Sequence, residues 1–332
     1  MSSGRASLSV DLLQRLLSRE RAAVSEALNL IDDRRPKWRR ESSALLAALE
    51  EAADGDARRV GLTGAPGAGK STLLDALVRR LRSRGETVGV VAVDPSSQRT
   101  GGALLGDRVR VRATGGDPGV FFRSMAARDR LGGLAEGTRA AATVLSAVFD
   151  VVLVETVGVG QSEGDVAHLV DTLVFVAQPG AGDLLQFMKA GVLELPDLFA
   201  VNKADLGPVA ERTRGELTAG LGLGEGDRSG WQPPVLSVSA RDGTGLDALL
   251  DAISAHRAHL EASGELAARR KRGRDAFVRE SLRARYGSYG TELIGGVAAI
   301  DERLRHAPEA SGFALADAVG REIEEALGKG GR

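Results

Sequence analysis

In the middle of this chain, short continuous apolar runs alternate with segments whose apolar residues recur at helical spacing. After the first run, residues 72–81 repeat their apolar positions at helical spacing, so one face of that helix is hydrophobic. Continuous Val/Leu runs separated by helices are typical of parallel strands buried on both faces. The pattern predicts an α/β domain with a mostly parallel sheet covered by helices on both faces, with strands at Val60–Thr63, Val88–Asp94, Asp150–Glu155, Thr172–Ala177, Leu198–Asn202 and Val235–Ser239.

The two ends of the chain lack strand signals and carry helical patterns. Ser9 is expected to cap a first helix, and further helices are expected over 21–30 and 43–51. Beyond about residue 258 the chain is again helical and highly charged. We therefore expect three parts: an N-terminal helical extension over 1–57, the α/β domain over 58–258, and a C-terminal helical arm over 259–332.

Composition narrows the class of protein. With 332 residues, 43% of them hydrophobic, the chain can build a sizeable core, and a net charge of −1 predicts no bulk attraction to nucleic acid or to an anionic membrane. Cysteine is absent, which excludes disulfides and thiolate chemistry and fits a reducing compartment. No signal peptide is visible at Met1–Arg5 and no apolar run is long enough to span a bilayer, so we expect a cytoplasmic location.

A complete phosphate-binding loop lies between the first expected strand and its helix. The pattern G-x-x-x-x-G-K-[ST] needs glycines so that backbone N–H groups can surround phosphates, and the helix N-terminus adds partial positive charge. Lys70 would neutralise the β- and γ-phosphates, and the Ser71 hydroxyl would ligate Mg²⁺. The predicted nucleotide-binding residues of this loop are Gly64, Ala65, Pro66, Gly67, Ala68, Gly69, Lys70, Ser71 and Thr72.

A guanine-reading motif follows a later strand. The Asp205 carboxylate can accept two hydrogen bonds from the N1–H and N2–H₂ edge of guanine, whereas adenine offers no such pair of donors. Lys203 would lie along the base plane and Asn202 would connect this loop to the phosphate loop. Ser239 and Ala240 end a further strand in the pair that GTPases place over the guanine carbonyl. The chain is therefore expected to bind GTP and GDP with Mg²⁺.

Further candidate catalytic residues lie between these motifs. Asp94 ends a strand and can hold the Mg²⁺ water shell or orient the attacking water, and Asp107 could be a second carboxylate facing the metal or a surface aspartate. Glu155 ends an apolar strand in the position of a Walker-B carboxylate. Gly158 lies where many GTPases sense the γ-phosphate through a glycine N–H, and Gln161 is a candidate for positioning water or a plain loop amide.

These motifs together resemble the MeaB/ArgK family, the GTPase chaperones of adenosylcobalamin-dependent acyl-CoA mutases such as methylmalonyl-CoA mutase. The resemblance rests on the phosphate loop, Val93–Ser97, Thr100–Asp107, Pro118–Met125, Glu155–Glu163 and Asn202–Asp205, and it covers roughly residues 10–300. It implies a P-loop G domain of the metal-chaperone type, in which Lys70, Asp94, Asp107 and Glu155 form the phosphate and metal group.

The resemblance also implies partners. GTP binding and hydrolysis would gate cobalamin loading and protect or repair the mutase, and an adenosyltransferase that delivers cobalamin would be a second partner. The C-terminal arm would form a homodimer. The loop around Asp183, Gln186 and Lys189, to which the residues alone assign no role, would be a third switch that responds to the mutase. Its Gly182-Asp183-Leu184-Leu185-Gln186 differs from the family's usual Gly-Asp-Glu-Leu-Gln, which leaves methylmalonyl-CoA mutase and an isobutyryl- or 2-hydroxyisobutyryl-type mutase as options.

Two other functions share this class of G domain. A nickel-insertion GTPase needs soft or imidazole ligands, and this chain has no Cys and four His. His256 and His259 are spaced to share a metal, but we expect two ordinary helix-surface histidines. A regulatory switch that recruits effectors without handling a cofactor is the other alternative.

Overall fold

The computed structural model describes residues 6–33, 35–52, 57–94, 116–126, 133–156, 162–180, 192–221 and 230–330. These residues form two compact units. Unit 1 comprises Met1–Ala57, Met125–Phe149 and Lys271–Arg332, and unit 2 comprises Arg58–Ser124 and Asp150–Arg270. The G-domain motifs fall in unit 2, and helices from both ends of the chain fall in unit 1.

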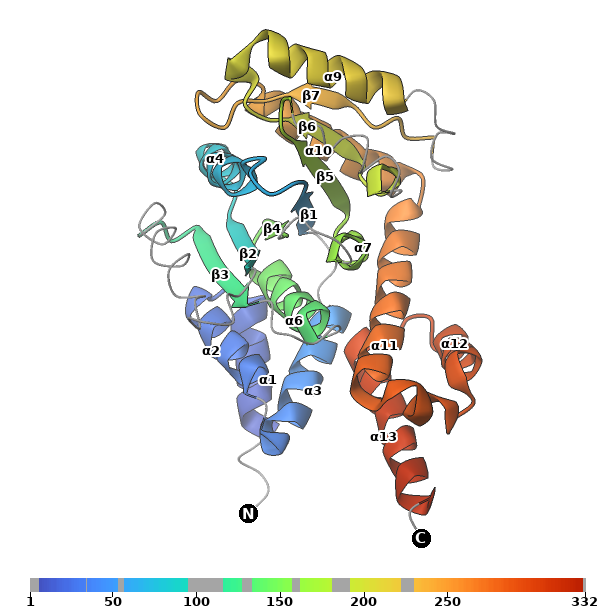
Figure 1. Cartoon of the computed structure of the whole chain (residues 1–332). Coiled ribbons are helices and arrows are strands. Elements are labelled where there is room, and N and C mark those ends of the chain that lie inside the picture. The colour runs from blue at the N-terminus through green and yellow to red at the C-terminus, as the bar shows by residue number, and fades with distance from the viewer. Residues whose placement is uncertain are drawn as a thin grey trace, which may run out of the picture. The chain divides into compact units, whose positions relative to one another are not determined.

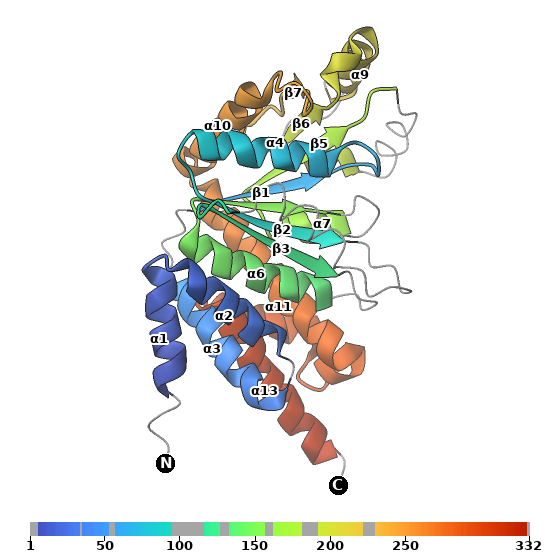
Figure 2. The same ribbon diagram turned by 90° about the vertical axis from the view of Figure 1, so that its left-hand side faces the viewer.

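The described strands form one seven-stranded sheet in the order β3-β2-β4-β1-β5-β6-β7 (Figures 1 and 2). β1 pairs in parallel with β4 and β5, and the pairs β2–β4, β5–β6 and β6–β7 are also parallel. This confirms the predicted α/β fold. The strands are β1 (Arg58–Thr63), β2 (Val88–Asp94), β3 (Val120–Ala126), β4 (Val151–Glu155), β5 (Thr172–Ala177), β6 (Leu198–Val201) and β7 (Val235–Ser237).

β3 is the strand that the sequence analysis did not predict. Figure 2 shows it beside β2 at the edge of the sheet. Its sequence, Val-Phe-Phe-Arg-Ser-Met-Ala, is interrupted by a charged residue and is half-buried over much of its length. An edge strand is covered less completely than a central one, so it lacks the continuous apolar run that identified the others.

Helices cover both faces of the sheet in unit 2. On one face, Val60 and Leu62 of β1 pack with leucines of α4 (Lys70–Ser83) and α10 (Leu246–Ala262). On the other face, Phe175 of β5 and Phe199 of β6 pack with α9 (Pro208–Leu221). β1, β5 and β6 contribute alternate residues to opposite faces, which explains why they read as unbroken apolar runs. Short helices α7 (Ser162–Ala167), η1 (Val192–Glu194) and η2 (Ala204–Leu206) complete the unit.

Unit 1 is helical. Its N-terminal helices pack on α6 and on one another, and α13 packs on α3. α1 begins at Ala6, so the prediction that Ser9 caps the first helix was wrong, and Ser9 lies inside it. The helices are α1 (Ala6–Leu17), α2 (Arg21–Asp32), α3 (Pro36–Ala52), α6 (Gly133–Val148), α12 (Gly296–His306) and α13 (Gly312–Gly330), with α11 (Glu265–Glu292) entering from unit 2.

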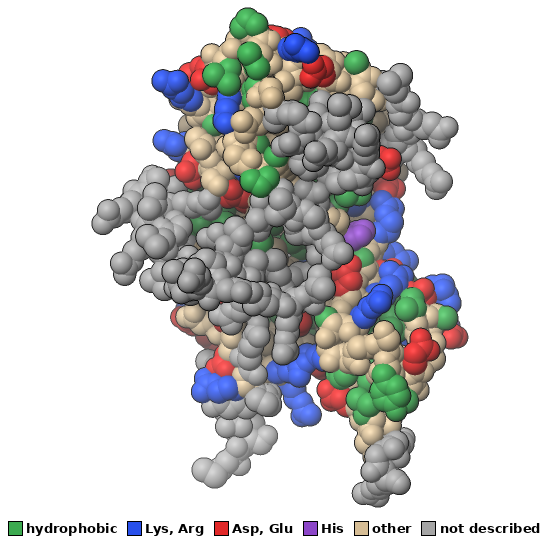
Figure 3. Space-filling view, in the orientation of Figure 1, with side chains coloured by type: hydrophobic (Ala, Val, Ile, Leu, Met, Phe, Trp, Pro, Cys, Tyr) green, Lys and Arg blue, Asp and Glu red, His purple; other side chains and the backbone are tan. Residues whose placement is uncertain are grey.

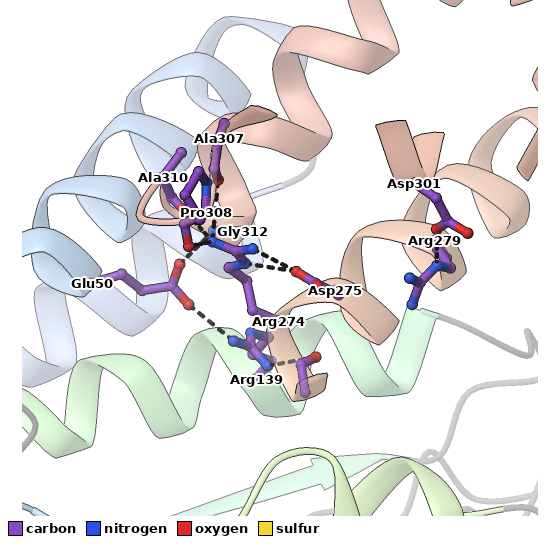
Figure 4. Close-up of polar contacts among 11 residues, drawn as sticks. Glu50, Arg139, Arg274, Asp275, Arg279, Asp301, Ala307, Pro308, Ala310 and Gly312 are labelled. Atoms are coloured by element: carbon purple, nitrogen blue, oxygen red, sulfur yellow. Dashed lines mark hydrogen bonds and ion pairs between the residues drawn. The ribbon is translucent and has the colours of Figure 1, made fainter. Parts of the chain in front are cut away.

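A polar network joins three parts of the sequence within unit 1 (Figure 4). Glu50 of α3 accepts hydrogen bonds from Arg139 of α6 at 3.3 Å, from the Ser311 hydroxyl at 2.7 Å and from the Gly312 N–H at 2.9 Å. Arg274 of α11 donates to the carbonyl of Ala310 at 3.1 Å. The start of α13 is therefore fixed to both the N-terminal helices and α11 by partly buried polar contacts as well as by apolar packing.

No helix within the described ranges is long and apolar enough to cross a membrane. The predicted division into three domains stays a prediction.

Candidate nucleotide-binding site

The predicted site residues that the structure describes gather at the carboxyl edge of the sheet. The phosphate loop follows β1, Glu155 ends β4, the guanine motif follows β6, and Ser239 and Ala240 follow β7. In an open parallel sheet, ligands bind beyond the carboxyl ends of the strands. Residues that are far apart in the sequence therefore come together because parallel pairing brings the ends of these strands to one edge.

The glycines of the phosphate loop are required by close contacts. Gly64 has φ 134°, and a Cβ there would lie 2.2 Å from the carbonyl oxygen of Val176. Gly69 has φ 85°, and a Cβ there would lie 2.6 Å from Asn202 Nδ2. Both positions combine a left-handed backbone with a distance that no side chain could occupy. The loop is thus held against β5 and the guanine motif, with α4 beginning directly after Gly69.

The Lys70 ammonium lies inside this loop. Its Nζ donates to the carbonyl oxygens of Gly64 at 2.7 Å and Ala65 at 3.0 Å, and the residue is only 7% exposed. Carbonyl acceptors of the loop thus hold the positive charge at the N-terminus of α4. Phosphate oxygens are stronger acceptors than carbonyl oxygens because they are charged, so a bound triphosphate can compete for this ammonium.

Ser71 and Glu155 form a second polar pair at the edge. The Ser71 hydroxyl donates to Glu155 Oε1. Glu155 is buried, and its register with Leu62 of β1 and Ala92 of β2 puts the carboxylate between those strands. Hydroxyl and carboxylate oxygens are the donors that Mg²⁺ uses, with phosphates and waters completing its octahedron. The sequence analysis assigned Glu155 to the position of a Walker-B carboxylate, and its role toward a metal stays a prediction.

Asn202 and Lys203 connect the guanine motif to the phosphate loop. Asn202 Nδ2 donates to the Ala68 carbonyl at 2.9 Å, and its Oδ1 accepts from the Ala240 N–H at 3.3 Å. Lys203 Nζ donates to the Gly67 carbonyl at 2.9 Å. One amide side chain therefore links three loops, of which only the link to the phosphate loop was expected from the sequence. The ammonium of Lys203 adds a second link to the phosphate loop.

Asp205 lies beside Ser239. The Ser239 hydroxyl donates to Asp205 Oδ1 at 3.0 Å, and Arg241 lies 3.7 Å from Oδ2. The serine orients the carboxylate while leaving it able to accept further donors, since a carboxylate has about four lone-pair sites. The contact with Arg241 was not foreseen from the sequence, although its position directly after Ser239 and Ala240 is the signal that could have identified it.

For several predicted site residues, the structure describes no side chain. The backbone of Asp94 ends β2, but its side chain is not among the described ones. Asp107, Gly158, Gln161, Asp183, Gln186 and Lys189 lie outside the described residues.

The opposite, amino edge of the sheet holds a second polar cluster that sequence reasoning missed. Asp171, which precedes β5, accepts from Arg257 at 2.9 Å and from two nitrogens of Arg270, each at 2.8 Å, and also from the Arg59 N–H at 3.1 Å. Asp171 is only 2% exposed. Burial alone would favour the neutral acid, but the hydrogen bonds from Arg270 and the charges of Arg270 and Arg59 hold the pKa of Asp171 below its usual range.

Asp197, which precedes β6, is bound in the same way. It accepts from Arg269 at 2.7 and 2.8 Å and from the Leu173 N–H at 2.7 Å. His256 of α10 lies beside it, with Nδ1 2.9 Å from the Thr172 hydroxyl and its ring 4.8 Å from that of Trp231. Thus the second turn of α11 is bound to the amino ends of β5 and β6 by two consecutive arginines.

His256 corrects a sequence expectation. It is 1% exposed, so it is a buried residue and not a helix-surface histidine. Burial, opposed by Asp197 and reinforced by Arg269, lowers the pKa of His256 to about 4. Within the part of the chain that the structure describes, no group of three or more His, Cys, Asp or Glu side chains could hold a metal ion. Both histidine rings lie near that of Trp231, at 4.8 Å for His256 and 5.5 Å for His259.

Comparison with known proteins identifies relatives that are GTPases, as the phosphate loop and the guanine motif predict. The model of a family described as methylmalonyl Co-A mutase-associated GTPase MeaB matches residues 24–287. A putative GTPase of Pyrococcus horikoshii is 45% identical over 264 residues, which cover 79% of this chain and 81% of that protein. The GTPase ArgK of Escherichia coli is 38% identical over 257 residues, covering 76% and 77% of the two chains. A crystal structure described as LAO/AO transport system kinase superposes with a TM-score of 0.70 at 29% identity, covering 97% of this chain and 98% of its own.

Proposed function

This chain belongs to the MeaB family of mutase-associated GTPases, and we propose that it is a GTP-dependent chaperone of a B12-dependent acyl-CoA mutase. In this role it gates the loading of adenosylcobalamin and protects or reactivates the mutase. The observation that carries the proposal is the combination of the family match with an assembled phosphate loop and guanine motif at the carboxyl edge of the sheet. The partner is methylmalonyl-CoA mutase or an isobutyryl- or 2-hydroxyisobutyryl-CoA mutase.

The nucleotide is held by groups of the carboxyl edge. The backbone N–H groups of the phosphate loop and the N-terminus of α4 bind the phosphates, and Lys70 exchanges its carbonyl acceptors for phosphate oxygens. Asp205 accepts the guanine donors while Ser239 orients it. Mg²⁺ fits the oxygen donors of Ser71 and Glu155, and when bound it neutralises charge that develops on the phosphates.

The residues that respond to the nucleotide and to the mutase in this proposal are those that the sequence analysis assigned. Asp94 and Asp107 contribute carboxylates toward the metal, Gly158 senses the γ-phosphate, and Gln161 positions the attacking water. The loop with Asp183, Gln186 and Lys189 responds to the mutase. Contact with the mutase completes the site, so hydrolysis by the isolated protein is slow and the mutase accelerates it. By linkage, the bound nucleotide alters the affinity for the mutase.

We also propose that the protein acts as a homodimer in the cytoplasm, with an adenosyltransferase as a second partner. Hydrophobic side chains reach the surface over the C-terminal helices (Figure 3), where Tyr289, Leu293 and Val297 are 72%, 40% and 54% exposed. These residues run from the end of α11 to the start of α12, and exposed apolar groups gathered over one short segment favour a protein interface. Light scattering tests this: Tyr289→Glu with Val297→Asp should turn a dimer into a monomer, and a monomeric wild type would contradict the dimer.

The function is tested by steady-state GTP hydrolysis with and without the B12-dependent mutase of the same genome. The mutase should raise turnover at least about tenfold, as partners that complete a GTPase site do. Lys189→Ala should lower the stimulation more than the basal rate, and Lys189→Arg should restore it.

A nickel-binding titration and the same assay separate the alternatives. No acceleration by any such mutase would leave the regulatory switch as the remaining function. Stoichiometric nickel binding, with hydrolysis coupled to nickel release, would favour the nickel-insertion GTPase.

A further inference from the structure

Two consecutive residues at the carboxyl end of β4 contact both ends of the phosphate loop. Glu155 ends the strand and accepts from the hydroxyl of Ser71, in the first turn of α4. Thr156 comes next, and its hydroxyl lies 3.2 Å from the hydroxyl of Thr63, the last residue of β1 before the loop. The end of β4 is therefore bound to the chain on either side of the phosphate loop.

The contact between the two threonines is buried and lies where their strands separate. β1 and β4 pair in register up to Leu62 and Glu155, and the Thr156 N–H adds a hydrogen bond to the Leu62 carbonyl at 3.0 Å. The Thr156 hydroxyl can also donate to that carbonyl, at 3.4 Å. Beyond this point β1 turns into the loop at Gly64, with φ 134°. Thr63 and Thr156 are only 1% and 2% exposed, so their hydroxyls join the strands away from solvent.

We propose that Thr156 is a positioning residue for GTP hydrolysis: through Thr63, its hydroxyl keeps the end of β4 at a fixed distance from the phosphate loop. The Glu155 carboxylate is held at that distance with it. The inference rests on the proposed role of Glu155 in hydrolysis. In the proposed site, Ser71 and Glu155 exchange their direct contact for the nucleotide and Mg²⁺, whereas the threonine pair is buried and can stay in place.

Other elements hold the centre of the phosphate loop. Asn202 Nδ2 donates to the Ala68 carbonyl at 2.9 Å, and Lys203 Nζ donates to the Gly67 carbonyl at 2.9 Å. Neither contact involves β4. Loss of the threonine pair should therefore change the position of Glu155 relative to the loop and leave the binding of a nucleoside diphosphate nearly unchanged.

Steady-state GTP hydrolysis and calorimetric titration with GDP test the inference together. Thr156→Val removes the hydroxyl and keeps the shape of the side chain. It should lower kcat about threefold to tenfold, the effect of one hydrogen bond, and leave GDP affinity within about twofold of the wild type. Thr156→Ser keeps the hydroxyl and should restore kcat. Thr63→Val should also lower kcat, and the double variant should lose no more than the larger single loss, because both changes remove the same contact.

Thr172→Val is the matched control at the other edge of the sheet. Thr172 is also 1% exposed, and its hydroxyl lies 2.9 Å from His256 Nδ1 at the amino end of β5. This change removes a buried hydroxyl from the same sheet, so it should lower the urea midpoint of unfolding and leave kcat at the wild-type value.

A wild-type kcat in folded Thr156→Val would overturn the inference. An equal fall of kcat in Thr156→Ser or in Thr172→Val would do the same, as would additive losses in the double variant or a GDP affinity that falls as far as kcat. If Thr156→Val does not fold, a wild-type kcat in Thr63→Val is sufficient to overturn it. A wild type that neither binds GDP nor hydrolyses GTP would instead contradict the proposed function.

Discussion

The two edges of one sheet use polar side chains in opposite ways. At the carboxyl edge, Lys70 is held by two backbone carbonyls, and Asp205 by one serine hydroxyl and a distant arginine. At the amino edge, Asp171 and Asp197 each accept a bidentate arginine and a backbone N–H. A ligand can replace the first kind of contact, whereas the second kind already occupies most of what the carboxylate can accept.

This difference separates function from stability within one unit. Charges at the carboxyl edge are positioned and still able to bind a ligand, so changes there should alter nucleotide chemistry and leave the fold intact. Charges at the amino edge are buried and paired, and removing one partner leaves the other without compensation. Changes at the amino edge should therefore alter stability and leave nucleotide affinity nearly unchanged.

The largest effect is expected from Lys70→Ala. It removes the charge that balances the transferring phosphoryl group, and GTP turnover should fall at least about a thousandfold. The melting temperature should change little, because the hydrogen bonds from the ammonium to the carbonyls of Gly64 and Ala65 stay within one loop. Phosphate-release kinetics and thermal melting on the same sample check both statements. Glu155→Ala should lower GTP turnover as Lys70→Ala does. If either variant is folded and hydrolyses GTP at the wild-type rate, that residue does not act in hydrolysis.

The opposite behaviour is expected from Asp171→Ala at the amino edge. It leaves Arg257 and Arg270 beside a buried gap, and the free energy of unfolding should fall by about 3 kcal/mol. Urea unfolding measures this, and GDP affinity at low temperature should remain that of the wild type. Asp251→Ala is the matched control, because Asp251 is 69% exposed and pairs with Arg84 at the surface. Equal stability of the two variants would contradict the role given to the amino edge.

Asp205→Asn should exchange base preference at the carboxyl edge. Replacing the carboxylate by an amide removes one of two acceptors and presents N–H donors to the base, so GDP affinity should fall about a hundredfold. Xanthosine diphosphate, which has a carbonyl in place of the amino group, should then bind better than GDP. Competition binding with both nucleotides decides, and a variant that still prefers GDP would show that Asp205 does not read the base.

The smallest effect concerns pH at the amino edge. His256 has its pKa lowered to about 4 in the fold, against an ordinary 6.5, so the unfolded state binds the proton more readily. The contribution of neutral His256 to the free energy of unfolding is complete above pH 6.5 and is lost progressively as the pH falls toward 4. Between pH 7.5 and 5 the loss should be about 2 kcal/mol.

Urea unfolding at several pH values tests this prediction. His256→Gln should flatten the dependence over that range. His306→Gln, which changes an exposed histidine at the end of α12, should not. An equal slope in the wild type and His256→Gln would show that other groups cause the pH dependence.

The sequence predicted the carboxyl edge far better than the amino edge. A phosphate loop and a guanine motif are local patterns, and their meeting follows from parallel strands with apolar runs such as Thr172–Ala177. The pairing of Asp171 with Arg270 depends on how α10 and the start of α11 cross the ends of the strands, and no short pattern encodes that. β3 was not predicted because it lies at the edge of the sheet, where a strand tolerates a charged residue. Arg123 interrupts the apolar run by which the other strands were recognised. The surroundings of His256 likewise depend on Trp231, which lies in a segment without regular structure.

The central claim is that the carboxyl edge of this sheet is a guanine-nucleotide site. Its most direct test is calorimetric titration of the wild-type chain with GDP and with ADP in the presence of Mg²⁺. The account predicts one GDP per chain and ADP binding at least about a hundredfold weaker, because adenine leaves the Asp205 carboxylate without its donors. Equal affinity for GDP and ADP would contradict it.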